Sequence, residues 1–261
     1  MIYLGTSGYS YADWKGVYYP PELPRHEWLE FYAREFGAVE LDFTYYQMPT
    51  ADQLKRLADR TPDGFRFAVK AHRDMTHNRG QDPGPFAQFR AALAPLGGEG
   101  KLGAVLLQFP YAFRNAEENV GYLLHCFDLL PDLPLIVEFR RVDWLTQRTA
   151  QLLRERAVGF CNVDLPRLPG LLPKTSLVTA SIAYVRFHGR NAKTWWKHEQ
   201  AWERYSYSYT EDELREWVPH LREMNEQAES CFAFANNHWQ GQSVATIKQL
   251  RLLMDRLAVD D

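Results

Sequence analysis

The sequence contains few cysteines, and their number and spacing exclude two kinds of stabilising site. Among 261 residues there are three cysteines, Cys126, Cys161 and Cys231. Because the number is odd and no CxxC pair occurs, neither a disulfide framework nor a cysteine-based zinc site is expected. We therefore expect reduced, buried thiols and a cytoplasmic location.

The chain also lacks a long apolar run and a large charge of either sign. No stretch approaches the roughly 18 uncharged apolar residues of a membrane span, and residues 1–10 show no basic segment before an apolar run. The 30 Lys and Arg against 33 Asp and Glu give a net charge of −3. This balance argues against a general nucleic-acid coat and against a basic membrane-surface protein. A soluble protein with no membrane partner is expected, although a local basic site stays open, and the sequence does not define an oligomeric state.

What the chain does contain is a series of short apolar runs separated by helical patterns. Each run is bounded by turn residues or by a charged end, which is typical of a buried strand. The eight candidate strands are Ile2–Gly5, Ala38–Leu41, Phe65–Lys70, Leu102–Phe109, Leu135–Phe139, Val158–Val163, Ile182–Phe187 and Cys231–Ala235.

Helix-start signals lie between most of these runs. Thr50, Asn115 and Thr210 are each followed three residues later by Gln or Glu, which predicts capping boxes. Pro219 lies inside the helical pattern that starts at Thr210 and is expected to kink it. Prolines and Gly170 crowd the stretch after the sixth strand, so its helix is expected to be short or missing.

Eight strand–helix units in this length predict one α/β domain over 1–261, a parallel eight-stranded (β/α)8 barrel of the TIM type. The alternative is a doubly wound sheet. Residues 5–11 after the first strand contain glycines but no GxGxxG, so the barrel is favoured.

Polar residues at the strand exits define the candidate site, because the active sites of such barrels lie at the C-terminal ends of the strands. Alternation along a strand places residues two apart on one face. It therefore groups Glu40 with Asp42, as well as three further inward sets. These are Lys70 with His72, Glu138 with Arg140, and Arg186 with His188 and Arg190.

Glu40, Lys70, Glu138 and His188 are the candidate catalytic residues. Glu138 beside Lys70 predicts either an acid–base pair, in which each group shifts the pKa of the other, or a plain buried ion pair. The alternative for the whole ring is an ion-pair network that joins Glu40 or Glu138 to Lys70, Arg140 or Arg186 and only closes the barrel.

Substrate binding is expected from further residues near the strand exits. The candidates are Ser7, Tyr9, Trp14, Gln108, Arg186, Arg190, Trp195, Asn236, Asn237 and His238. No cofactor is predicted. A divalent metal held by carboxylates and by histidines 72, 77, 188 and 238 stays open, although no HxH or HxxE spacing supports it.

Two exit loops are basic in spite of the acidic whole. The stretch 70–79 has a net charge of +2, and the stretch 186–204 has a net charge of +3 and carries Trp195, Trp196 and Trp202. Basic and aromatic residues together suit a phosphate, a sugar or a nucleic-acid strand. The alternative is a lid loop whose tryptophans pack on the barrel rim.

The motifs around these exits carry a resemblance to a known family. They are GTSGYSYADWKGVYYP at 5–20, VELDFTYYQMP at 39–49, FAVKAHRDMTH at 67–77, LGAVLLQFP at 102–110, VEFRRVDW at 137–144, YVRFHGR at 184–190 and NNHWQG at 236–241. In this order the sequence resembles the DUF72 family of YecE-like and YunF-like proteins over nearly its whole length. The resemblance implies a single (β/α)8 barrel with these residues around its C-terminal mouth, and it brings no established reaction.

The sequence therefore predicts an isomerase-like or hydrolase-like enzyme that uses carboxylate acid–base chemistry on a small anionic or polyhydroxylated substrate. Two alternatives stay open: a barrel that binds nucleic acid or processes phosphodiesters, and a barrel that binds a ligand without catalysis.

Overall fold

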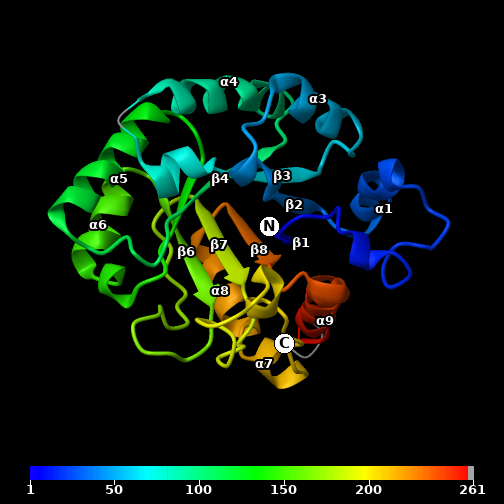
Figure 1. Ribbon diagram of the computed structural model, residues 1–261. Coiled ribbons are helices and arrows are strands. Elements are labelled where there is room, and N and C mark those ends of the chain that lie inside the picture. The colour runs from blue at the N-terminus through cyan, green and yellow to red at the C-terminus, as the bar shows by residue number, and fades with distance from the viewer. Residues whose placement is uncertain (81, 258–261) are drawn as a thin grey trace.

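The computed structural model describes residues 1–80 and 82–257, and in this range eight parallel strands alternate with helices (Figure 1). The domain predicted over 1–261 includes Gln81 and residues 258–261, which lie outside the described residues. The strands are β1 Ile2–Thr6, β2 Ala38–Leu41, β3 Arg66–Lys70, β4 Leu102–Gln108, β5 Leu135–Glu138, β6 Gly159–Asp164, β7 Ile182–Phe187 and β8 Ser230–Ala235. The α-helices are α1 Trp28–Glu35, α2 Phe43–Tyr46, α3 Ala51–Asp59, α4 Gly84–Gly98, α5 Glu117–Leu129, α6 Gln147–Glu155, α7 Glu211–Arg215, α8 Val218–Gln227 and α9 Gln242–Leu257.

The strands follow one another around a nearly closed barrel, which confirms the predicted fold. From β2 to β8 each strand pairs in parallel with the next one along the chain, and β8 pairs with β1. Figure 1 shows the helices arranged around the strands. None of the helices in the described ranges has the length and hydropathy that a membrane crossing requires.

The barrel closes between β1 and β2 without a regular ladder. A single bridge joins Ser7 to Glu40, and the Gly8 amide donates to the Glu40 carbonyl at 2.7 Å. Lower down, the Tyr32 hydroxyl from α1 accepts from the Thr6 amide at 2.8 Å and donates to the Ala38 carbonyl at 3.1 Å. The phenol therefore takes the place of backbone bonds that the two strands do not make.

Gly5 permits this close approach of β1 to β2. A Cβ at this position would lie 2.1 Å from the Ala38 carbonyl oxygen, which is backbone and cannot rotate away. A side chain here would force the two strands apart, so the first strand needs glycine at this point.

The predicted strand bounds agree with the structure to within one residue at each end. The capping boxes at Thr50 and Thr210 are confirmed, with each hydroxyl accepting the amide hydrogen three residues later. The cap at Asn115 is wrong. α5 begins at Glu117, and the Asn115 amide instead donates to the Asp143 carbonyl at 2.8 Å in the next loop.

Proline shapes the second half of the barrel. Pro219 was expected to kink one helix, and it instead lies in the first turn of a separate helix, α8, where its missing amide hydrogen costs nothing. Between β6 and β7 the described residues form no helix, as the prolines predicted. The chain crosses there as an irregular segment whose Thr179 hydroxyl accepts from the Phe160 amide at 2.8 Å.

Candidate functional site at the barrel mouth

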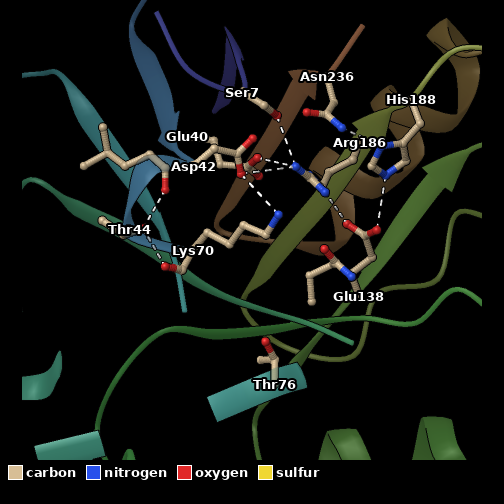
Figure 2. A network of polar contacts seen from close by, with 12 residues as sticks. Ser7, Glu40, Asp42, Thr44, Lys70, Thr76, Glu138, Arg186, His188 and Asn236 are labelled. Carbon is tan, nitrogen blue, oxygen red and sulfur yellow. Dashed lines mark hydrogen bonds and ion pairs between the residues drawn. The ribbon is translucent and has the colours of Figure 1, made fainter. Parts of the chain in front are cut away.

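Arg186 on β7 lies at the centre of the polar interior. One end of its guanidinium donates to Glu40 on β2 at 2.5 Å, and the other donates to Glu138 on β5 at 2.7 Å. Since neither β2 nor β5 neighbours β7, these contacts cross the inside of the barrel, as the alternation of the strands predicted. Ser7 adds a longer contact to the guanidinium at 3.3 Å (Figure 2).

The two carboxylates on Arg186 have opposite pKa shifts. Burial raises the pKa of Glu40, and Arg186 opposes burial without cancelling it. Burial would also raise the pKa of Glu138, but Arg140, Arg186 and His188 outweigh burial and hold this pKa well below its usual range. Glu138 is therefore ionised throughout the neutral range, whereas Glu40 is the carboxylate that takes a proton more readily.

His188 faces Glu138 as a neutral imidazole. Burial, with Arg140 second, lowers the pKa of His188 to about 3. Its Nδ1 lies 3.0 Å from the Asn236 side-chain amide, and its Nε2 lies 3.2 Å from Glu138 Oε1. An amide that donates to Nδ1 leaves the ring hydrogen on Nε2, so the imidazole points a hydrogen toward the carboxylate.

The predicted pair of Glu138 with Lys70 is wrong. Lys70 Nζ lies 3.4 Å from Asp42 and 4.9 Å from the centre of the Tyr45 ring. Glu138 instead lies 2.7 Å from Arg140. Figure 2 shows Lys70 turned toward Asp42 on one side of Arg186, with Glu138 on the other. The arginine pairs of the predicted ion-pair network are present.

Above this network lies a cavity of about 240 Å³, called the mouth cavity below. Its basic side chains are Lys70, Arg140 and Arg204, and no Asp or Glu of the described residues lines it. Its aromatic and histidine side chains are Tyr45, Tyr46, His77, Tyr111, Trp195, Trp196 and Tyr205, and Gln108, Pro110 and Leu171 complete the lining. Tyr46 and Trp196 are 72% and 48% exposed, so the rim is aromatic and open to solvent.

Two ionisable groups in the mouth cavity have shifted pKa values. Burial, followed by Lys70 and Arg140, lowers the pKa of His77 to about 4, which favours the neutral ring. Burial alone would raise the pKa of Tyr205, but nearby cations outweigh burial and lower it. Burial alone explains the direction of the His77 shift, but only the cations explain the direction of the Tyr205 shift, so the Tyr205 shift is the one that indicates positive potential.

Several predicted binding residues lie away from the mouth cavity. Arg190 makes three bonds to Asp164, at 2.8, 2.9 and 3.2 Å, and lines a separate cavity of about 460 Å³ with it. Tyr9 lines another cavity, of about 400 Å³, beside Phe43 and α3. Gln108 and Trp195 do line the mouth cavity.

Trp14, Asn237 and His238 connect the first and last loops of the barrel. The Trp14 indole donates to the His238 carbonyl at 2.7 Å, and the His238 ring stacks on Tyr11 at 4.5 Å. The Asn237 amide donates to the Tyr207 carbonyl at 2.8 Å. These contacts use the Trp14 indole and the Asn237 amide hydrogens, whereas Asn237 Oδ1 and His238 Nδ1 are buried and have no partner among the described residues.

The tryptophan-rich loop after β7 packs mostly on the rim. Trp195 is 2% exposed, and Trp202 stacks on Trp239 of the eighth loop at 3.8 Å. Trp196 alone of these three is largely exposed, and it contacts the edge of Tyr111 at 4.8 Å. The loop therefore forms a fixed wall of the mouth cavity.

Sequence patterns did not identify Tyr45, Tyr111 and Tyr205 as site residues. Each lies beyond a strand exit, in a loop or a short helix, where alternation along a strand gives no direction to a side chain. The available signal was their position in the loops that follow β2, β4 and β7. Among the described residues no three His, Cys, Asp or Glu side chains gather as a metal site would require.

Comparison with known proteins relates this barrel to a family of undefined activity. Residues 3–259 match the family model described as "Protein of unknown function DUF72". The UPF0759 protein YunF of Bacillus subtilis is 33% identical, over 98% of this chain and 95% of its own length. The UPF0759 protein YecE of Escherichia coli is 29% identical over 50% of this chain and 45% of its own.

Solved structures of similar proteins share the whole fold. A DUF72 family protein from Thermotoga maritima superposes with a TM-score of 0.91 at 37% identity, covering 98% of this chain and 99% of its own. One from Enterococcus faecalis superposes with a TM-score of 0.87 at 26% identity, covering 98% and 96%. These relatives share the barrel over its full length.

Proposed function

Because the chain belongs to the DUF72 family, whose activity is undefined, we propose from the geometry of the mouth cavity that this protein is an enzyme acting on a small anionic substrate. The observation that carries the proposal is the charge of the lining. Lys70, Arg140 and Arg204 share one cavity of about 240 Å³, and none of its lining side chains is acidic. Phosphate, sulfate and carboxylate groups are the ligands that such a set of donors favours.

Of the three cations that line the mouth cavity, Arg204 is the one without an acidic partner among the described residues. The ion pairs of the described residues include none for Arg204, whereas Lys70 and Arg140 contact Asp42 and Glu138. Its guanidinium lies 5.5 Å from the centre of the Trp195 ring, which holds it at the cavity wall. An anion that enters would gain a guanidinium without displacing a carboxylate.

The buried network supports the cavity from below. Glu40 and Glu138 are fully buried and are bonded to Arg186, and Glu138 also contacts Arg140, so in this proposal Glu138 holds one of the cavity cations in place. Of the two carboxylates, Glu40 takes up a proton more readily because its pKa is raised, and it accepts a bond from the buried Tyr184 hydroxyl at 2.6 Å.

Sulfate binding tests the proposal without knowledge of the substrate. Sulfate should raise the melting temperature of the native protein more than that of the Arg204→Gln variant, because the general stabilisation by sulfate acts on both. The Arg204→Gln variant should bind sulfate roughly ten to a hundred times more weakly in calorimetry, since it loses one charge-assisted bond. Arg215→Gln is the matched control, because Arg215 pairs with Glu211 and Asp212 on the outer surface. Equal affinities in the two variants would remove the mouth cavity from consideration.

Turnover separates an enzyme from a barrel that only binds. Phosphorylated and carboxylated metabolites would be incubated with native protein and analysed by mass spectrometry. An enzyme should convert at least one of them, and Lys70→Met should lose that conversion. Recovery of a bound compound unchanged after prolonged incubation would instead favour the ligand-binding alternative.

A single-stranded oligonucleotide is the second candidate ligand. The exposed faces of Tyr46 and Trp196 at the rim could stack bases while the cavity holds a phosphate. Binding of this kind should weaken steeply as salt rises, and Trp196→Ala should weaken it at every salt concentration. Absence of binding at low salt would leave the small anion as the ligand class.

A further inference from the structure

The ring of Tyr205 is fixed between the buried network and the mouth cavity. Its centre lies 6.0 Å from the His188 ring and 6.1 Å from Trp195, edge to face with the tryptophan. Its amide donates to the Trp202 carbonyl at 2.9 Å and ends the short 3₁₀ helix Ala201–Arg204. The ring is therefore held on two sides and by its own backbone.

The hydroxyl of Tyr205 is free to meet a ligand. The hydrogen bonds of residues 1–80 and 82–257 give this oxygen no partner, and the side chain lines the mouth cavity. By contrast, Tyr184 and Tyr209 in the same half of the barrel are bonded to Glu40 and Asp164. Tyr45, Tyr46 and Tyr111 also line this cavity, and the described residues give their hydroxyls no bond either. Of these four phenols, Tyr205 is the one whose ring contacts both His188 of the buried network and Trp195.

Cations face Tyr205 from several elements. Lys70 lies at the end of β3, Arg140 follows β5, and Arg186 lies on β7. Arg204 precedes Tyr205 directly. The nearest acids pair with three of these cations, Asp42 with Lys70, and Glu138 with Arg140 and Arg186, so Arg204 is the one without an acid partner among the described residues.

The other titratable groups around Tyr205 are neutral at neutral pH. Burial is the largest cause that lowers the pKa of His77 to about 4 and of His188 to about 3, so both rings are uncharged. Burial raises the pKa of Tyr45 and of Tyr46. For Tyr205 burial acts in the same direction, but Arg140, Arg204, Lys70 and Arg186 outweigh it and lower the pKa. Tyr205 therefore loses its proton before Tyr45 and Tyr46 do.

We propose that Tyr205 is the proton-transfer residue of the mouth cavity, exchanging a proton between its hydroxyl oxygen and an anionic ligand held by Lys70, Arg140 and Arg204. This proposal rests on the proposed function. In the forward step the phenolate oxygen forms a bond to the hydrogen of a ligand O–H or C–H group. The broken bond leaves its electron pair on the ligand, where the three cations stabilise the charge. Return of the proton restores the phenolate, so no other reactant is needed.

Nuclear magnetic resonance of protein labelled with carbon-13 at the tyrosine ring carbon bearing the hydroxyl tests the proposal. The chain has 14 tyrosines, and in the native protein one of their signals should titrate below the ordinary pKa of about 10. That signal should be lost in Tyr205→Phe, which keeps the ring and its contacts. It should persist in Tyr46→Phe, the control at the same cavity, and should move to higher pH in Arg204→Gln. A native protein with no such signal, or a Tyr205→Phe variant that keeps it, overturns the proposal.

Sulfate links this titration to the cavity. Bound sulfate should raise the pKa of the Tyr205 signal, and by linkage native protein should bind sulfate more weakly once Tyr205 is ionised. Tyr205→Phe should keep its affinity for sulfate and lose that pH dependence. Sulfate that binds without moving the signal overturns the role of Tyr205 and leaves the anion site standing. Failure of sulfate to bind native protein overturns the proposed function, and the titration then decides on Tyr205 by itself.

Discussion

Arg186 is fully buried, and its charge is compensated by Glu138 and Glu40 on opposite sides. Such an arrangement is tolerable only while both partners remain, because a buried cation without its counter-ion has lost its hydration and gained nothing in return. Glu138 carries more of this compensation, since it also faces Arg140 and stays ionised.

The Glu138→Gln substitution should therefore be strongly destabilising. We expect the free energy of unfolding to fall by about 3–5 kcal/mol, because two buried guanidiniums lose their shared carboxylate. Urea unfolding at neutral pH measures this loss. Glu30→Gln breaks a surface pair with Arg60 and should cost no more than about 1 kcal/mol. Similar losses in the two variants would contradict a central role for Glu138.

His188 predicts how stability depends on pH. Burial lowers its pKa in the folded protein to about 3, below the roughly 6.5 of an unfolded chain. Between these two pKa values, His188 binds a proton in the unfolded chain but not in the folded protein. The contribution of neutral His188 to the free energy of unfolding is complete above about pH 6.5. As the pH falls from there toward 3, the free energy of unfolding decreases by up to about 1.4 kcal/mol per pH unit.

Urea unfolding between about pH 7 and about pH 5 tests this slope. His188→Asn should flatten it, whereas His26→Asn, at a histidine on the surface, should follow the native curve. A slope that stays the same in His188→Asn would show that other groups cause the acid sensitivity.

At this scale the sequence could predict which side chains point inward but not which of them meet. Alternation along the strands identified Glu40, Glu138 and Arg186, because direction is a property of a single strand. Partners depend on the stagger between strands that are distant in sequence, so Lys70 was paired with Glu138 where Asp42 lies nearer. The sequence did not predict Tyr205 as a site residue for a related reason, because the path of its loop is fixed by packing on the barrel rim.

Between elements, the weakest seam of the barrel is the gap between β1 and β2. Among the described residues one bridge and the hydroxyl of Tyr32 hold it, whereas the other neighbouring strands share ladders, from two residue pairs between β5 and β6 to six between β7 and β8. The phenol both accepts and donates there, and it is fully buried, so water cannot replace it.

The Tyr32→Phe substitution should weaken the contact between β1 and β2. Two buried backbone groups lose a partner, and we expect a loss of about 1–3 kcal/mol in the free energy of unfolding. Tyr3→Phe is the matched control, because the Tyr3 ring stacks on Phe232 and the described residues give its hydroxyl no bond. Amide hydrogen exchange at Thr6 should also accelerate in Tyr32→Phe and not in Tyr3→Phe. Equal stability of the two variants would mean that the seam is held in another way.

The helix boundaries show which local signals suffice for prediction. Thr50 and Thr210 cap as predicted because the hydroxyl and the backbone it bonds lie within one turn. Asn115 has the same local pattern, but Asp143 in the next loop offers its amide a competing carbonyl. Such competition between distant segments is not visible in a local pattern.

Across the whole molecule, we expect the end of the barrel away from the mouth to contribute to stability and not to the proposed anion binding. At the end away from the mouth, Lys101 lies just before β4 and is buried. Its ammonium donates to the carbonyls of Ala58 and Thr61 at 2.6 and 2.8 Å, at the C-terminal end of α3. A cation at this position adds a charged donor to two buried carbonyls at the C-terminal end of the helix, where positive charge is favourable.

Lys101→Met and Arg204→Gln should therefore separate the two ends. Lys101→Met should lower the free energy of unfolding by about 2 kcal/mol, since two buried carbonyls lose a charged donor, and should leave the sulfate affinity of the folded protein unchanged. Arg204→Gln should weaken sulfate binding and leave the free energy of unfolding nearly unchanged, because no ion pair of Arg204 in the described residues supports the fold. Urea unfolding and calorimetric titration with sulfate on the same preparations measure both quantities. If Lys101→Met weakened sulfate binding as much as Arg204→Gln, the ends would be coupled through the strands, and the charge of the mouth cavity alone could not account for the binding.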